Sequence, residues 1–537
     1  MDKKQTKYIF VLGGVMSGLG KGIAAASIGY LLKQAGVKVT IMKLDPYLNV
    51  DPGTMNPYQH GEVFVLDDGS ETDLDLGHYE RFIDVNMTKN NNATSGQIYS
   101  TVLEKERKGE YLGDTVQVIP HVTDEIKNRI RKLNNDGNYE VVICEVGGTV
   151  GDIESLPFME AIRQLSLEVG YHNHMLVHVT LLPFIKASGE LKSKPTQHSV
   201  MKLREIGLSP DMILCRSEHA IEQSVRDKIA LFCNVRSDHV IEGRDVPSIY
   251  EVPLVMHEQN AGHLIKERLK IKKTPKLKKL RNFIKNYKNP KNQVTIAMCG
   301  KYTELIDSYK SVMESFVHAG VENNARVNIK WVKTEKIKSN VSAEKEFEGV
   351  DGILLLPGFG SRGVEGKVRS SKYARDTNTP FLGICLGLQC AVIDYARNVC
   401  GLTDANSTEF NKKTKHAVID LMESQKAIKI KGGTMRLGAY DCDILPETKI
   451  FKAYRKNKIS ERHRHRFEVN NKYKKILEKN GLTFSGVNSD LGVVEAIEIS
   501  DHPWYVASQF HPELKSRVNK AHPLFRDFIK ATIKNKS

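Results

Sequence analysis

The chain has 537 residues, of which 40% are hydrophobic and 27% charged, a balance typical of a soluble globular protein. This length predicts two to four domains, and no apolar stretch approaches the roughly 20 residues that a membrane-spanning helix needs. The formal net charge of +15 could indicate nucleic-acid binding, but much of it lies in one basic segment without aromatic residues in a nucleic-acid-binding pattern. We therefore expect neither nucleic acid nor membrane as a partner.

The beginning of the chain and the cysteine content both bear on the compartment. The start MDKKQTKYIF enters an apolar strand directly and lacks the hydrophobic region of a signal peptide. The eight cysteines show neither paired nor C-x-x-C spacing, which argues against a disulfide framework and against a zinc site. These features predict a cytoplasmic protein.

The first predicted strand, residues 7–12, is followed by a glycine-rich loop, 13–22, and a helix over 23–34. This order of a strand, a glycine-rich loop with a lysine and a helix is typical of a phosphate-binding loop. In such a loop, backbone amide groups and a lysine, here Lys21, neutralise the phosphates. The loop has one residue more than the usual pattern between its glycines, and Gly22 replaces the hydroxyl that normally ligates magnesium. The alternative is a glycine turn that only permits close packing.

Because Gly22 supplies no metal ligand, carboxylates must come from elsewhere in the chain. Magnesium prefers hard oxygen ligands, typically one or two carboxylates with phosphates and waters. Asp75 lies in an acidic stretch, and Glu145 follows the apolar strand that begins at Val141, where open α/β sheets bind ligands. We expect these two residues to be the magnesium ligands; for neighbouring Asp73 a solvated acidic loop is a fair alternative.

Strand-like and helix-like segments alternate along the whole chain, which predicts an α/β fold with two domains. Residues 1–266 form the first domain with a mostly parallel sheet, 267–292 a basic linker with a solvated helix, and 293–537 a second α/β domain. The expected strands lie near Ile9, Val39, Val116, Val141, Leu176, Ile213 and Val240, and then near Val294, Val327, Ile353, Phe381 and Val506.

A cysteine on a tight turn stands out in the second half. The apolar run 379–384 predicts a buried strand and Leu386 begins a helix, so Cys385 lies on a strand-to-helix turn framed by glycines. The positive end of the helix dipole favours its thiolate. His511 would activate it and Glu513 would orient the histidine. The alternative is an ordinary core cysteine.

This arrangement resembles the class I glutamine amidotransferases, whose cysteine takes the amide of glutamine and releases ammonia. Longer runs resemble the CTP synthase family, in order and spacing, from about Lys7 to about Ile529. The runs span residues 42–82, 145–158, 192–200, 406–410, 432–438 and 462–470. The resemblance implies an N-terminal P-loop dethiobiotin-synthetase-like amidoligase domain and a C-terminal flavodoxin-like class I glutamine amidotransferase domain.

The resemblance also implies an activity. A ligase of this family aminates UTP at C4 to give CTP, using ATP, Mg²⁺ and ammonia from glutamine, as the last step of de novo CTP synthesis. It further implies CTP as feedback inhibitor, GTP as allosteric activator, and a homotetramer with UTP sites at the subunit interfaces.

Site residues follow from the resemblance position by position. For ATP they are Gly18, Leu19, Gly20, Lys21, Gly22, Ile23, Asp75 and Val246, with Lys43 as a second cation at the transferring phosphate. For UTP or CTP they are Ser17, Asp152, Ile153, Glu154, Lys192, Ser193, Lys194, Pro195, Thr196, Gln197 and Lys228. For glutamine they are Gly358, Leu386, Gly387, Leu388, Gln389, Glu409 and Arg466.

The chain departs from the family pattern in two places. The oxyanion loop has Pro357 where the family more often has glycine, and proline donates no amide hydrogen. Gly358 keeps its amide, so we expect the oxyanion hole to survive. The stretch between Phe410 and Gly432 is short relative to some relatives, which alters a surface excursion.

Two other classes of protein share part of these features. An amidotransferase that acts on a carboxylate, such as a cobyrinic acid, would share the phosphate loop and Cys385 but would lack the 192–197 segment. A nucleotide switch of the partitioning-ATPase class would explain the phosphate loop, but it gives no reason for Cys385, His511 and Glu513 together.

Overall fold

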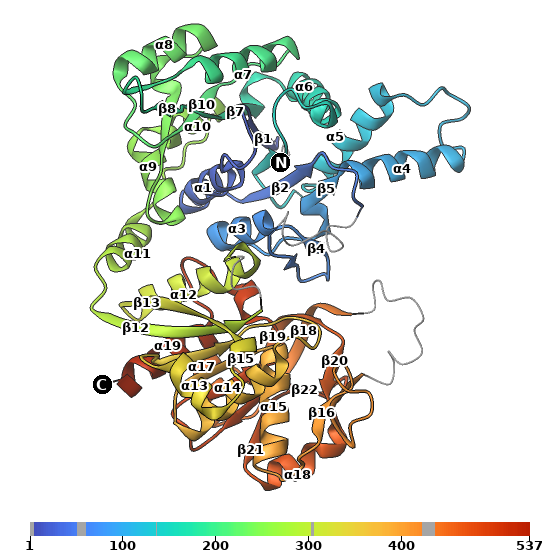
Figure 1. The fold of residues 1–537 in the computed structure, drawn as a ribbon. Helices are drawn as coiled ribbons and strands as arrows, with labels where there is room; N and C mark the ends of the chain where they lie inside the picture. Colours follow the sequence, from blue (N-terminus) through green and yellow to red (C-terminus); the bar gives the residue numbers. More distant parts are fainter. Residues whose placement is uncertain (1–4, 51–60, 136, 302–305, 422–434, 537) are drawn as a thin grey trace. The chain divides into compact units, whose positions relative to one another are not determined.

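The structure is a computed structural model that describes residues 5–50, 61–135, 137–301, 306–421 and 435–536. Parts of two family-like runs, 51–60 and 432–434, and residues 422–432 of the short 410–432 stretch lie outside the described residues. The chain divides into two compact units, one of Met1–Thr54 with Asp75–Ile284 and one of Met55–Leu74 with Lys285–Ser537 (Figure 1). Residues 61–74 thus belong to the second unit, although the rest of that unit follows more than 200 residues later.

The first unit is built on a seven-stranded parallel sheet, in the order β11-β10-β7-β1-β6-β2-β5. Its strands are nearly continuous apolar and buried runs, as expected when both faces of a parallel sheet are covered. They are β1 (Lys7–Gly13), β2 (Val39–Asp45), β5 (Asn92–Thr94), β6 (Val141–Val146), β7 (His174–Leu181), β10 (Met212–Ser217) and β11 (Val240–Arg244).

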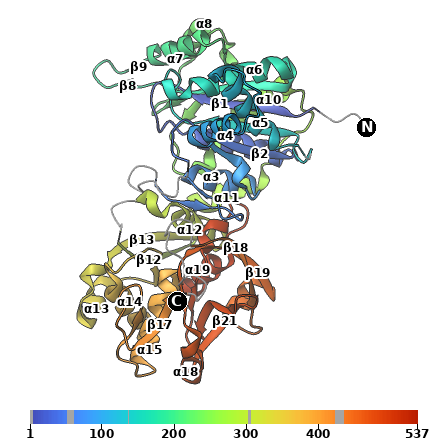
Figure 2. The same ribbon diagram turned by 90° about the vertical axis from the view of Figure 1, so that its right-hand side faces the viewer.

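Helices pack on both faces of this sheet (Figure 1, Figure 2). Helix α1 contacts β1, β2 and β6, whereas α4, α5 and α6 share a hydrophobic cluster with alternate residues of the same strands. The helices are α1 (Lys21–Gln34), α3 (Leu74–Ile83), α4 (Ser95–Arg107), α5 (Thr123–Lys132), α6 (Leu156–Val169), α7 (Lys194–Glu205), α8 (Gln223–Cys233), α9 (Val252–Glu258), α10 (Ala261–Leu269) and α11 (Lys278–Lys288). Helix α11 lies in the basic segment and buries Leu280, Phe283 and Ile284.

The strand predicted near Val116 is wrong. Residues 114–117 are irregular and lead into a short π-helical turn, Val118–Val122, before α5. Val118 and Ile119 are 45% and 53% exposed, so this apolar run is not packed into the sheet. An apolar run forms a strand only where a neighbouring strand accepts its hydrogen bonds, and sheet partners are not visible in local sequence.

The second unit contains a nine-stranded mixed sheet in the order β13-β12-β14-β15-β23-β22-β21-β18-β19. Its parallel part has the 2-1-3-4-5 order of flavodoxin-like folds, and the strands beyond β23 are antiparallel. The strands are β12 (Asn292–Gly300), β13 (Ala325–Lys333), β14 (Gly352–Leu355), β15 (Phe381–Ile384), β18 (Arg436–Ile444), β19 (Lys458–His465), β21 (Leu482–Asn488), β22 (Val493–Ile499) and β23 (Tyr505–Ser508).

Two hydrophobic clusters cover the two faces of this sheet, and successive residues of β12 alternate between them. Helices α13 (Asn340–Phe347), α14 (Val364–Asp376), α15 (Leu386–Asn398) and α18 (Lys474–Lys479) contribute to one cluster. Helices α12 (Lys310–Glu322), α17 (Lys449–Tyr454) and α19 (Pro523–Lys536) contribute to the other. Smaller sheets comprise β16 (Ala405–Ser407), β17 (His416–Leu421) and β20 (Phe467–Val469), the pair β3 (Phe64–Val65) and β4 (Glu71–Thr72), and the pair β8 (Phe184–Ile185) and β9 (Glu190–Leu191).

None of the helices in the described part of the chain is long and apolar enough to cross a membrane.

Candidate active sites

Cys385 lies between the end of β15 and the start of α15, with a positive φ of 53° and ψ of −101°. Its amide donates a 2.7 Å hydrogen bond to the Ser508 carbonyl of β23, which holds the strained turn in place. The flanking glycines serve close packing and not the sharp angle itself. A Cβ at Gly387 would lie 2.6 Å from the Leu355 carbonyl, and one at Gly383 would lie 2.9 Å from Ala507 Cβ.

His511 and Glu513 form a buried pair beside Cys385. The imidazole Nδ1 is 2.7 Å from Glu513 Oε1, and the His511 amide donates to the Arg462 carbonyl at 2.8 Å. Burial alone lowers the pKa of His511, but the charge of Glu513 and then that of Cys385 raise it to about 10. His511 Nε2 makes no hydrogen bond within the described part of the chain, so it can serve a reacting group.

A cavity of about 210 Å³ opens on these side chains. Its lining brings together Cys385, His511, Glu513 and Gly358, four of the residues predicted for glutamine chemistry. The lining also includes Gly61, Glu62 and Val63 from the early part of the chain, together with Ser308, Tyr309, Pro357, Phe359, Arg464 and Leu514.

The other predicted glutamine residues lie around this cavity but do not line it. Glu409 accepts a 2.8 Å hydrogen bond from the amide of Gly360, in the oxyanion loop. Burial raises the pKa of Glu409, and the nearby charges of Lys301 and Arg466 oppose that rise. Gln389 donates to the Phe467 carbonyl at 3.0 Å, and Leu386, Gly387 and Leu388 form the first turn of α15.

Two side chains next to this site carried no sequence signal. Gln509 is fully buried, and its amide Nε2 lies 3.7 Å from Cys385 Sγ. Lys367 of α14 is also fully buried and donates to the Leu356 carbonyl, immediately before Pro357. Burial lowers the pKa of Lys367 to about 8. Gln509 is 124 residues from Cys385 in the sequence, so spacing gives no sign of the first contact.

In the first unit the glycine loop joins β1 to α1. Gly18 and Gly20 have φ values of 74° and 83°, a conformation that favours glycine. Lys21 is buried at the first turn of α1, where its Nζ donates to the Gly148 carbonyl at 2.6 Å. Burial is the main cause that lowers the pKa of Lys21.

The residue opposite Gly22 is Asp75, at the first turn of α3. A Cβ at position 22 would lie only 2.2 Å from Asp75 Oδ1, so the missing side chain leaves room for this carboxylate. Lys43 forms ion pairs with Asp75 and with Glu145, the latter at 2.7 Å. The register of the sheet explains the second pair, because Lys43 of β2 lies directly beside Glu145 of β6.

The two carboxylates fit a magnesium ion that is shared with nucleotide phosphates. Burial raises the pKa of Asp75, but Lys43 and His78 outweigh it and the net shift is downward, so this group is an anion. Tyr79 donates to Glu145 Oε2 at 2.8 Å and fixes the second carboxylate. Within the described part of the chain no group of three or more acidic, histidine or cysteine side chains could hold a metal ion.

Val246 shares a cavity of about 300 Å³ with Leu19, Gly20 and Ile23 of the phosphate loop. The cavity extends from the phosphate loop toward β11 and α9, as a nucleoside attached to the phosphates requires. The rest of the lining comprises Ala24, Val179, Leu214, Arg216, Glu242, Gly243, Arg244, Asp245, Ile249, Val252, Val255 and Met256, which the sequence did not single out.

The residues predicted for UTP or CTP lie on loops and helices of the first unit, with Lys228 exposed on α8. Ser17, Asp152, Ile153 and Glu154 are exposed, and Asp152 Oδ2 accepts from the amide of Thr149 at 2.7 Å.

The 192–197 segment leads into helix α7, with Ser193 as its N-cap and Pro195 in the first turn. Lys192 forms an ion pair with Glu190. The hydrogen bond and charge of Lys192 lower the pKa of the Glu190 carboxyl, and the charge of Lys228 also lowers it. Lys194 is exposed, and Ser193 accepts from Gln197 at 3.0 Å. Thr196 is buried, and its hydroxyl lies 3.1 Å from that of Thr180.

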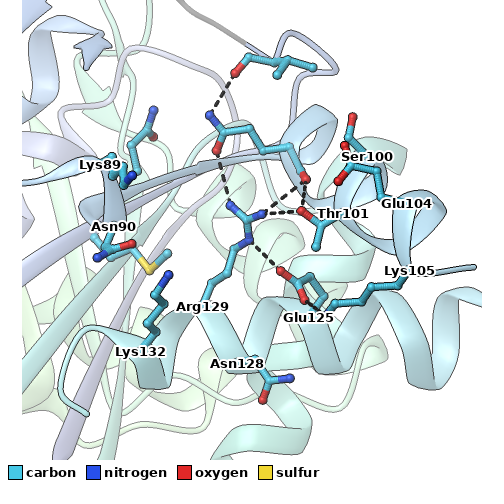
Figure 3. A pocket seen from close by; sticks show the side chains of 14 residues that line it. Lys89, Asn90, Ser100, Thr101, Glu104, Lys105, Glu125, Asn128, Arg129 and Lys132 are labelled. Atoms are coloured by element: carbon cyan, nitrogen blue, oxygen red, sulfur yellow. Dashed lines mark hydrogen bonds and ion pairs between the residues drawn. The ribbon is translucent and has the colours of Figure 1, made fainter. Parts of the chain in front are cut away.

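A separate cavity of about 640 Å³ lies between α4, α5 and the edge strand β5 (Figure 3). Arg129 is held there by Glu125 and Thr101, at 2.9 and 2.8 Å. Met42 lines this cavity, whereas the next residue of the strand, Lys43, points to the phosphate site on the opposite face. None of the predicted site residues lines it.

Comparisons with known proteins identify the family of the chain. Residues 7–271 match a family model described as CTP synthase N-terminus, and residues 304–531 match one described as glutamine amidotransferase class-I. A CTP synthase of Caldanaerobacter subterraneus subsp. tengcongensis is 57% identical over 98% of this chain and 98% of that protein. One of Clostridium acetobutylicum is 55% identical over 99% of this chain and 100% of that protein.

Among solved structures, the glutaminase domain of a Trypanosoma brucei CTPS with bound acivicin is 39% identical, with a TM-score of 0.43. It covers 45% of this chain, and the match spans 94% of that domain. The near-complete coverage of the two CTP synthases, together with both family models, is decisive. This chain belongs to the CTP synthase family.

Proposed function

We propose that the protein is a glutamine-dependent CTP synthase, which converts UTP, ATP and glutamine to CTP, ADP, phosphate and glutamate. The observation that carries this proposal is the presence, in a chain of this family, of two complementary sites. One has the Cys385–His511–Glu513 arrangement, and the other has Lys21, Lys43 and two carboxylates beside a phosphate loop. Ammonia made at the first site is the reactant needed at the second.

Glutamine hydrolysis begins with attack of the Cys385 thiolate on the side-chain carbonyl of glutamine. Amides of Gly358 and Leu386 would stabilise the oxyanion, and Glu409 and Arg466 would hold the charged ends of the amino acid. His511 donates its proton to the departing nitrogen, which leaves as ammonia. Water, deprotonated by His511, then cleaves the thioester and releases glutamate. Glu513 keeps the imidazole oriented throughout, which its 2.7 Å contact supports.

The synthetase reaction converts a poor leaving group into a good one. Uracil O4 attacks the γ-phosphorus of ATP, ADP departs, and O4 now carries a phosphoryl group. Ammonia attacks C4 and phosphate leaves with O4, which yields CTP. Phosphoryl transfer depends mainly on positioning and charge neutralisation, and Lys21 and Lys43 supply both.

Mg²⁺ is proposed as the ion that accompanies ATP. Asp75 and Glu145 would hold it, and when bound it would neutralise charge on the transferring phosphates. Gly18 to Ile23 would cradle the phosphates, and Val246 would contact the adenine in the 300 Å³ cavity.

The remaining assignments rest on the family. UTP and CTP would share the residues from Lys192 to Gln197 and Lys228 for their triphosphates, with Ser17 and Asp152 to Glu154 nearby. We also propose CTP as feedback inhibitor, GTP as allosteric activator, a homotetramer and a cytoplasmic location. The domains are proposed as residues 1–266 and 293–537, joined by the basic linker 267–292.

The test is the absorbance change as UTP becomes CTP, with ATP and magnesium and with either glutamine or ammonium as nitrogen donor. Turnover with both donors is expected. If UTP were inert while a carboxylate acceptor consumed ATP and ammonium, the chain would be an amidotransferase of another substrate class.

A further inference from the structure

A hairpin from the early part of the chain belongs structurally to the glutaminase unit. It comprises residues Glu62–Thr72, with β3 and β4 as its strands, and is called the acidic hairpin below. Its first residues, Glu62 and Val63, line the Cys385 cavity. The acidic hairpin is therefore part of the wall around the glutaminase site.

Three carboxylates attach the acidic hairpin to the rest of the unit. Glu62 Oε2 accepts hydrogen bonds from both the amide and the hydroxyl of Ser311, at 3.0 and 2.5 Å. Asp67 Oδ1 lies 2.5 Å from Arg462 Nε, and Glu71 Oε1 lies 2.6 Å from Arg464 Nε. Charge-assisted contacts of this length are strong and directional, so they fix the side chains on both sides.

The backbone of the acidic hairpin is also held closely. The Asp67 carbonyl accepts from the amide of Ala439 in β18 at 2.9 Å. A Cβ at Gly438 would lie 2.6 Å from the amide nitrogen of Gly69, so only a glycine allows this approach. The acidic hairpin thus makes close backbone contact with β18.

The two arginines that bind the acidic hairpin touch the catalytic residues through their own backbone. The carbonyl of Arg462 accepts the amide hydrogen of His511 at 2.8 Å. The carbonyl of Arg464 lies 4.0 Å from Cys385 Sγ. Arg462 and Arg464 are two positions apart in β19, so they project from the same face of that strand.

The Arg462 side chain is fully buried, with 0% exposure, which makes its pairing necessary. A buried guanidinium without its carboxylate carries an uncompensated charge and shifts to find water or another partner. Lys515 lies 3.5 Å from the same carboxylate, so Asp67 neutralises two cations next to the histidine. Loss of Asp67 therefore disturbs the β19 backbone at the point where it holds His511.

We propose that Asp67 and Glu71 are positioning residues of glutamine hydrolysis. Through Arg462 and Arg464 they hold the two β19 carbonyls that support His511 and Cys385, without touching glutamine themselves. The inference rests on the proposed function for the identity of the substrate. It assigns to the acidic hairpin a part in the chemistry of the second unit, to which it belongs.

The experiment uses the full chain and three variants: Asp67→Asn, Glu71→Gln and the control Asp441→Asn. Asp441 pairs with Lys458 of the same strand β19 at 2.9 Å, but both side chains are at least half exposed. The measurements are glutamate release, CTP formation from ammonium, and thermal unfolding. We expect the kcat for glutamate release to fall about 10- to 100-fold for the hairpin variants, because small displacements of reacting groups have effects of this order.

The pattern across the measurements separates positioning from general damage. For Asp67→Asn and Glu71→Gln we expect the KM for glutamine and the ammonium-dependent rate to stay within about twofold of the parent. The Asp441→Asn control should change none of them, since exposed ion pairs contribute little. If Asp67→Asn does not fold, the double variant Asp67→Asn with Arg462→Met replaces it in the measurements. The double variant removes the buried guanidinium charge together with its carboxylate partner.

Unchanged kcat for glutamate release in folded Glu71→Gln and in the folded position-67 variant would overturn the proposal. An equal fall of the glutamine and ammonium activities would also overturn it, since that would show damage beyond the glutaminase site. If the parent protein released glutamate but made no CTP from ammonium, the proposed function would fail while the hairpin measurement still stood.

Discussion

The two candidate sites reach their working geometry in opposite ways. At the glutaminase site the backbone is strained at Cys385 and the His511–Glu513 pair is already in contact, so the catalytic groups are preorganised. At the phosphate site Lys43 is paired with Asp75 and Glu145, so the charges satisfy one another. We infer that the first site needs only its substrate, whereas the second must exchange internal ion pairs for ligand contacts.

The largest expected effect separates the two sites completely. Cys385→Ala removes the nucleophile, so glutamine-dependent CTP synthesis should fall by at least about 10³-fold. Ammonium-dependent synthesis should stay largely intact, because the phosphate site does not use the thiol. Parallel CTP assays with the two donors check this, and loss of both activities in a folded variant would show that the sites are not separable.

The next prediction tests the two carboxylates that are ion-paired with Lys43 at the phosphate site. Asp75→Asn or Glu145→Gln removes a hard anionic ligand, so ammonium-dependent synthesis should fall by about 10²-fold or more. Glutamate release at Cys385 should persist. Titrating magnesium against the ammonium-dependent rate is the measurement, and either residue loses its proposed role if its variant makes CTP at a near-normal rate.

A smaller effect concerns the exposed lysines that UTP and CTP are proposed to share. Lys192→Ala or Lys228→Ala should raise the KM for UTP and the inhibition constant for CTP together, because each removes a positive charge from the shared triphosphate site; a rise of about tenfold corresponds to about 1.4 kcal/mol. UTP saturation curves at several CTP concentrations decide it. A CTP effect on the maximal rate alone, with the apparent UTP affinity unchanged, would exclude a shared triphosphate site.

The smallest expected effect is a pH dependence of the free energy of unfolding, which comes from His511 at the glutaminase site. His511 has a folded pKa of about 10, above the unfolded value of about 6.5 for histidine. Its contribution to stability is therefore complete below about pH 6.5 and is lost as the pH rises through 10. Urea unfolding of the parent and of His511→Gln between pH 6 and pH 10 should show the difference between them shrinking with rising pH; a constant difference would contradict the raised pKa.

The sequence-based predictions that the fold confirms rest on local motifs. The apolar strands β1, β6 and β15 and helix α1 were all foreseen, because a buried parallel strand and a glycine turn before a helix leave a signature within about ten residues. The proximity of His511 and Glu513 follows from their separation of two residues. Val116 shows the limit of such reasoning, since its apolar run has no strand to pair with.

The order of residues along the chain does not predict contacts between segments that are far apart in the sequence. The acidic hairpin precedes Asp75 of the first unit in sequence, yet its carboxylates bind Arg462 and Arg464 nearly 400 residues later. Neither Gln509 beside Cys385 nor Lys367 under the oxyanion loop could be found from spacing. The sequence shows that Gly22 supplies no metal ligand. Only the structure shows that the carboxylate of Asp75 occupies the space that a side chain at position 22 would need.

The amino-acid sequence by itself determined the family and the α/β class and predicted the chemical groups at both candidate sites, because these depend on residue types at short spacings along the chain. The tertiary structure alone decided which carboxylates meet which cations, which glycines serve packing, and which unit the acidic hairpin joins. The physical reason is that ion pairs and close packing act through space over a few ångströms, and the sheet register that brings such residues together is set by the whole fold.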